Sequence, residues 1–241
     1  MSRYNWNWAI LFTEPYFGWL LEGVMVTFSL ALSGAAIALT LGSLIGIART
    51  LPIAVLRWIG TAYVELFRNI PLLVQMFLWF FVLPEVLPQA IGQWLKRGLL
   101  YPEFYSAMMC LGFYYASRVA EQVRSGIGSV PRGLSMAAQA TGLSLAQTYR
   151  RILLPLAFRI IVPTLTSELL SIFKGSSIAL TIGVLEIIAQ SRQIESYTFH
   201  AYEAFTAAIV LYLMMGLSLL FLIRRLESHT RVPGWIARFD A

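Results

Sequence analysis

Few side chains in this 241-residue sequence are suited to catalysis. It contains two histidines, His200 and His229, and one cysteine, Cys110, and it lacks both an H-E-x-x-H zinc motif and a G-x-x-x-x-G-K-[ST] phosphate loop. A reactive site needs a nucleophile beside a base, and a metal site or a disulfide needs partners that a single cysteine lacks. We therefore predict that the chain is not an enzyme and that it binds neither a metal nor a cofactor.

A lysine in a long apolar stretch could instead bind a charged solute. Lys174 is followed by Gly175 and by the hydroxyls of Ser176 and Ser177. If this stretch crosses a bilayer, the ammonium costs about 2.5 to 3.5 kcal/mol, so it should face a cavity or an acidic partner. Together the cation and the hydroxyls could bind a carboxylate. An ion pair with an acidic group on another helix or subunit is the alternative.

Glu168 is a second polar residue of the same stretch, and we place it with Lys174 in a substrate pathway. It precedes Lys174 by six residues, which is about 240° around a helix, so the two are not expected to pair with each other. Glu65 and Arg68 lie three residues apart, and a structural ion pair on one helical face is expected there.

The composition indicates that these residues belong to a membrane protein. Hydrophobic residues make up 58% of the chain and charged residues 12%, and the mean hydropathy is +0.70. Soluble domains carry roughly a quarter charged residues, so the chain is suited to lipid. Its net charge of +6 is better explained by Lys and Arg retained on the cytoplasmic side than by binding to nucleic acid, which we do not expect.

Five apolar stretches predict an all-α integral membrane protein with five spans, at about residues 24–48, 58–84, 104–124, 160–190 and 204–223. Gly42 and Gly46 have the spacing that lets two helices approach closely, and Pro71 predicts a kink in the second span. Most of the 18 Lys and Arg residues fall inside if the N-terminus is outside and the C-terminus inside. Residues 1–20 would then be a periplasmic or interfacial segment, 21–226 the transmembrane domain and 227–241 a cytoplasmic tail.

The longest connection, 125–159, is polar and patterned. We expect one short helix over Leu134–Thr141, a break at Gly142 and a second helix over Leu143–Leu153 that ends at Pro155. This organisation favours a docking surface for another protein over an ordinary loop.

The same segment carries a recognisable motif. Met136-Ala137-Ala138-Gln139-Ala140-Thr141-Gly142, followed by Arg150 to Pro155, resembles the coupling loop of the permease subunits of bacterial ABC importers. Tyr63 to Gln75, Ala120 to Ile127, and Phe173 to Ser177 leading to Glu186 are similar to signatures of the polar amino-acid branch of that family. Within the branch, Val82 to Pro88 and Val162 to Glu168 resemble the importers of glutamate and aspartate.

The resemblance implies a type I ABC importer permease arrangement in the bacterial inner membrane. The expected partners are a homologous second permease subunit forming a heterodimer, two ATP-binding subunits that hold ATP and Mg, and a periplasmic amino-acid-binding protein. The expected solute is glutamate or aspartate; another polar amino acid such as glutamine, histidine or arginine, or an ion-driven secondary transporter, is the alternative.

The resemblance also assigns residues that couple the permease to its ATPase: Met136, Ala137, Ala138, Ala140, Gly142, Leu143, Leu145 and Pro155. One of them departs from the family pattern. The motif usually begins with glutamate, and this chain has Met136 there, so we expect this subunit to hold its ATPase by packing.

Overall fold

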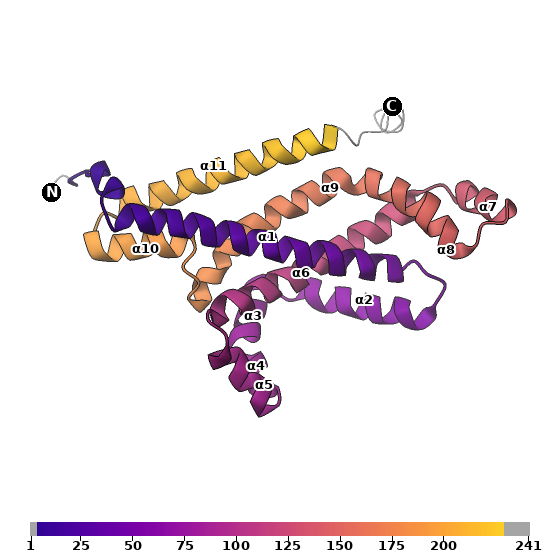
Figure 1. Ribbon diagram of the computed structural model, residues 1–241, viewed down its shortest axis with the longest axis horizontal. Coiled ribbons are helices and arrows are strands. Elements are labelled where there is room, and N and C mark those ends of the chain that lie inside the picture. The colour runs from indigo at the N-terminus through magenta and orange to yellow at the C-terminus, as the bar shows by residue number, and fades with distance from the viewer. Residues whose placement is uncertain (1–3, 229–241) are drawn as a thin grey trace.

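The computed structural model describes residues 4–228, and within that range the protein is built of helices without strands (Figure 1). The α-helices are α1 (Tyr16–Ala48), α2 (Ala54–Asn69), α3 (Leu72–Phe77), α4 (Leu83–Val86), α5 (Gln89–Gln93), α6 (Pro102–Ser129), α7 (Arg132–Ala140), α8 (Leu145–Thr148), α9 (Leu154–Gly175), α10 (Ile187–Thr198) and α11 (Ala201–Ser228). Short 3-10 helices cover Trp8–Phe12 and Ser176–Ile182, and π-helical turns cover Leu78–Val82, Trp94–Gly98 and Tyr149–Leu153. All but the first two residues of the predicted tail 227–241 lie outside the described range.

The core forms where α1 and α9 both pack against α6 and contact each other (Figure 1). A methyl group added at Gly42 would lie 2.7 Å from the carbonyl oxygen of Ala116, and one added at Gly46 would lie 2.7 Å from that of Ala120. Only glycine permits such a close approach of two backbones. The close packing predicted from the spacing of Gly42 and Gly46 is confirmed.

Three helical segments are long and apolar enough to cross a membrane: Tyr16–Ala48, Leu145–Ile182 and Ala201–Arg225. The pair Ala54–Asn69 and Leu72–Val86 would make a fourth if its two bent parts count as one span. The helix α6 carries Arg118, Glu121 and Arg124 in its second half. The five-span count and the orientation of the termini stay predictions.

The predicted second span is not one kinked helix, because α2 and α3 meet at 103°. Pro71 has no N–H to continue the helix, and the Gln75 side chain stabilises the break. Its Nε2 donates to the carbonyl oxygens of Phe67 at 2.8 Å and of Ile70 at 2.9 Å. These are the carbonyls that lose their partners where a helix ends.

The predicted fourth span, 160–190, also ends early. The helix α9 continues as a 3-10 helix to Ile182, and the chain turns at Gly183, whose φ of +94° is accessible mainly to glycine. Glu186 then begins α10, where its carboxylate accepts a hydrogen bond from the Ala189 amide at 2.8 Å. Glu186 is therefore the N-cap of α10 and not part of the helix α9, and it is buried, where it also accepts a hydrogen bond from the Tyr212 hydroxyl on α11 at 2.6 Å.

Candidate functional site

The predicted coupling segment folds as a helix, a turn and a helix, at one end of the molecule and away from α10 (Figure 1). The end of α7 is a Schellman motif: the Gly142 amide donates to Gln139 at 2.9 Å, and the Leu143 amide donates to Ala138 at 3.1 Å. This motif requires a left-handed residue, and Gly142 has a φ of +86°. The break predicted at Gly142 is confirmed.

The helix α8 begins with a capping box. Ser144 Oγ accepts from the Gln147 amide at 3.3 Å, and Gln147 Oε1 accepts from the Ser144 amide at 2.8 Å. Because both ends of the turn are fixed by hydrogen bonds, α7 is held at a defined position beside α8 and is not a loose loop.

The two short helices expose apolar side chains. Met136 is 64% exposed and Leu145 is 43% exposed, and Leu134 is also exposed. We call the exposed surface of α7 and α8 that carries these three side chains the docking face. Exposed apolar side chains on an otherwise polar segment are a feature of surfaces that contact other proteins. Of the other predicted coupling residues, Ala137, Ala140 and Gly142 are exposed, Leu143 is half-buried, and Ala138 is buried.

Pro155 does not end the second helix, contrary to the sequence prediction. The helical segment runs from Leu145 to Ile182 without a break. A π-helical turn over Tyr149–Leu153 precedes Pro155, and the Leu154 amide closes it by donating to Tyr149 five residues back. The wider turn accommodates a residue that has no N–H, so the proline is tolerated inside the helix.

Lys174 lies on the exposed side of α9, and in the part of the chain that the structure describes its ammonium makes no ion pair or hydrogen bond. Ser177 is half-buried next to it, and its hydroxyl donates to the Lys174 carbonyl at 2.8 Å. Ser176 points elsewhere: it is fully buried and donates to the Phe173 carbonyl at 2.7 Å. The structure therefore brings Lys174 and Ser177 together and separates Ser176 from them.

The helix α9 and the 3-10 helix that continues it, Ser176–Ile182, carry a row of hydroxyl groups that the sequence reasoning missed. These residues are exposed or half-buried and follow Lys174 in both directions at steps of three or four: Thr164, Ser167, Ser171, Ser177 and Thr181. Each hydroxyl donates to a carbonyl of the preceding turn, which lowers the cost of placing it in an apolar medium. The helical spacing was visible in the sequence and could have revealed the row.

Glu168 lies on the other side of α9, where it is 7% exposed. The Arg118 guanidinium on α6 donates to it from Nε at 2.7 Å and from Nη2 at 3.0 Å, and Gln122 Nε2 donates at 2.9 Å. A carboxylate so buried and so fully bonded joins α6 to α9. This corrects the expectation that Glu168 and Lys174 line the same pathway.

The predicted pair between Glu65 and Arg68 is wrong, because each residue has another partner. Glu65 accepts from Asn69 Nδ2 at 3.2 Å. Arg68 Nη1 lies 4.0 Å from Glu121 Oε2 on α6, where Glu121 also binds Arg49 at 2.6 Å and Arg124. Glu121 is half-buried on α6, whereas Glu65 is exposed, so Arg68 lies near the carboxylate that already binds two other arginines.

Comparison with known proteins covers most of the chain. Residues 38–232 match the family described as "Binding-protein-dependent transport system inner membrane component". The glutamate/aspartate import permease protein GltJ of Escherichia coli (strain K12) is 44% identical over 95% of this chain and 97% of its own length. The glutamine transport system permease protein GlnP of the same strain is 30% identical over 95% of this chain and 99% of its own length.

The fold is also found in solved structures. A chain from the crystal structure of an amino acid ABC transporter with histidines has a TM-score of 0.79 and 24% identity, and the match covers 94% of this chain and all of that one. A chain of the MetNI methionine ABC transporter in an inward-facing conformation has a TM-score of 0.75 and 21% identity. That match covers 91% of this chain and all of the MetNI chain. At these identities the likeness concerns the fold.

Proposed function

Because the chain belongs to the family of binding-protein-dependent transport system inner membrane components, we propose that it is a permease subunit of an ABC importer that carries glutamate and aspartate across the inner membrane. The observation that carries this proposal is the 44% identity to a glutamate/aspartate permease over nearly the full length of both chains. Among the described residues 4–228 the ammonium of Lys174 has no partner, which supports the proposal, since an acidic solute offers a second carboxylate for a cation to bind.

Other polar amino acids are the second candidate. Relatives named as glutamine permeases are 30% identical to this chain. An uptake assay separates the two: vesicles that contain this chain and its companion subunits should accumulate labelled glutamate and aspartate, and excess unlabelled aspartate should compete better than excess glutamine. Better competition by glutamine would assign the importer to the second class.

The proposed assembly contains a second permease subunit, two ATP-binding subunits and a periplasmic amino-acid-binding protein. In this proposal ATP and Mg bind the separate ATP-binding subunits, and the permease itself catalyses no reaction. The docking face on α7 and α8 would contact one ATP-binding subunit, with the exposed Met136 contributing by apolar packing. An ion-driven carrier would have no use for such a face, which favours the ATP-driven class.

The proposed topology has five spans with the N-terminus outside and the C-terminus inside. Reporter fusions after Gln93 and after Tyr197 should report the periplasm, and fusions within residues 133–147 should report the cytoplasm. A cytoplasmic signal after Gln93 would overturn this topology, and the fusion after Tyr197 provides the independent check.

Coupling is proposed to depend on the Gly142 turn. A β-branched residue at a φ of +86° is strained by about 1 to 2 kcal/mol, so Gly142→Val should displace α7 and lower solute-stimulated ATP hydrolysis about tenfold. The matched control is Gly133→Val, because Gly133 lies in α7, the helix that the turn follows, and like Gly142 has open space around it, but has an ordinary φ. Equal stimulation in the two variants would contradict a coupling role for the turn.

A further inference from the structure

One stretch of this chain is rich in arginine and contains no acidic residue. Between Glu121 and Glu168 the sequence has no Asp or Glu, and it contains Arg124, Arg132, Arg150, Arg151 and Arg159. Two arginines of the helical bundle lie close to carboxylates: Arg49 lies 2.6 Å from Glu121, and Arg118 lies 2.7 Å from Glu168. The stretch that includes α7 and α8 contains no carboxylate of its own that could pair with its arginines.

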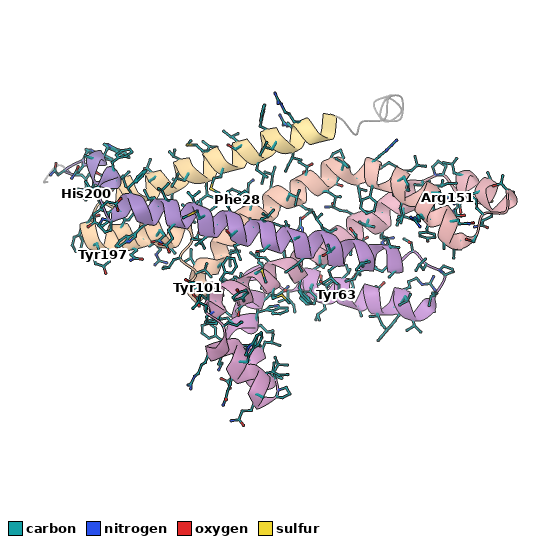
Figure 2. The ribbon with its side chains drawn as sticks, viewed as in Figure 1. Phe28, Tyr63, Tyr101, Arg151, Tyr197 and His200 are labelled. Carbon is teal, nitrogen blue, oxygen red and sulfur yellow. The ribbon has the colours of Figure 1, made fainter. Side chains whose placement is uncertain are left out.

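Two of these arginines line a hollow. The hollow has a volume of about 450 Å³ and is lined by Ala146, Gln147, Arg150 and Arg151, and we call it the α8 hollow. Arg150 and Arg151 are exposed, and within residues 4–228 neither forms an ion pair or a side-chain hydrogen bond. Figure 2 labels Arg151 beside α8, at the opposite end of the molecule from His200 and Tyr197.

The α8 hollow adjoins the docking face, since Ala146 of the hollow follows Leu145 of that face. The surface offered to a partner is therefore apolar on one side and cationic on the other, and neither α7 nor α8 contains an acidic residue. A guanidinium presents a planar fork of donors that matches a carboxylate with two parallel hydrogen bonds. A partner that fits this surface carries acidic side chains.

We propose that the α8 hollow receives carboxylate side chains of the ATP-binding subunit, with Arg150 and Arg151 supplying the cations. This inference rests on the proposed function. It assigns this subunit a coupling contact in which the permease contributes the arginines and the ATPase contributes the carboxylates.

The test measures binding of the purified ATP-binding subunit to the permease pair in nanodiscs of zwitterionic lipid. Arg150→Gln/Arg151→Gln should raise the dissociation constant about tenfold for each arginine at low salt. It should also flatten the salt dependence, because screening acts on the charges that were removed. Arg159→Gln is the matched control: Arg159 is exposed and belongs to the same acid-free stretch, but it does not line the hollow.

Unchanged binding by the double variant, or an equal loss in the Arg159→Gln control, would overturn the proposal. A loss that appears only in nanodiscs containing anionic lipid would assign the arginines to lipid headgroups and overturn it as well. Retention of the companion permease subunit verifies that the variant is folded. Failure of the wild-type complex to take up amino acids would contradict the proposed function and not this contact.

Discussion

Arg118→Met is expected to prevent stable assembly of the permease. The substitution leaves the Glu168 carboxylate buried between α6 and α9 with Gln122 as its remaining hydrogen-bond partner. Removing one partner of a buried ion pair costs about 3 to 5 kcal/mol. We expect the lower part of that range, because the Arg118 side chain is itself 43% exposed. The measurement is the yield and the melting temperature of the purified complex.

A second variant separates the charge from the packing. Arg118→Met/Glu168→Gln removes both charges of the pair. The side-chain amide introduced at position 168 can still accept a hydrogen bond from Gln122. Assembly and the melting temperature should therefore return close to those of the wild type. If Glu168 is purely structural, transport should return as well. Full assembly without transport would make Glu168 a pathway residue, and a wild-type melting temperature for Arg118→Met alone would refute the role of the ion pair.

Local features of this fold could be predicted from the sequence. The close packing of α1 on α6 follows from two small residues four apart, Gly42 and Gly46, whose effect depends only on helical spacing. The turn after α7 follows from Gly142, because a helix followed by glycine ends in a left-handed residue. The family could also be predicted, since its motifs are short and contiguous.

Features that depend on contacts between distant segments could not be predicted. Pro71 signals a kink, but the bend of 103° also involves hydrogen bonds from Gln75. Arg68 lies three residues from Glu65 and yet turns toward Glu121 on another helix. Arg118 and Glu168 are fifty residues apart, and spacing along a single helix carries no information about such a pair.

A candidate site at Lys174 could be proposed from the sequence, but the residues around it could not be predicted. A lysine deep in an apolar stretch marks a functional position because of the cost of its charge. The residues that share its surface depend on how α9 is rotated against its neighbours. That rotation buries Glu168 and Ser176 and exposes the hydroxyl row from Thr164 to Thr181.

Lys174→Met is expected to reduce uptake of glutamate and aspartate by about 10- to 100-fold. A hydrogen bond to a charged group contributes about 1.5 to 3 kcal/mol, and methionine keeps the length of the side chain while it removes the charge. Uptake of glutamine should fall much less, because glutamine carries a neutral side-chain amide in place of the carboxylate that would bind the Lys174 ammonium. The measurement is uptake of labelled amino acids by reconstituted vesicles.

The chain offers a matched control, because Lys96 is its other lysine. Lys96 follows α5 and contacts Glu85, away from α9, so Lys96→Met should leave uptake unchanged. Lys174→Arg should retain most of the preference for acidic solutes, since it keeps the charge. Wild-type uptake by a fully assembled Lys174→Met complex would exclude a role in solute binding. Loss of the companion permease subunit from the Lys174→Met complex would instead show that Lys174 pairs with an acidic group of that subunit. Such an ion pair would be needed for assembly, whichever solute the complex carries.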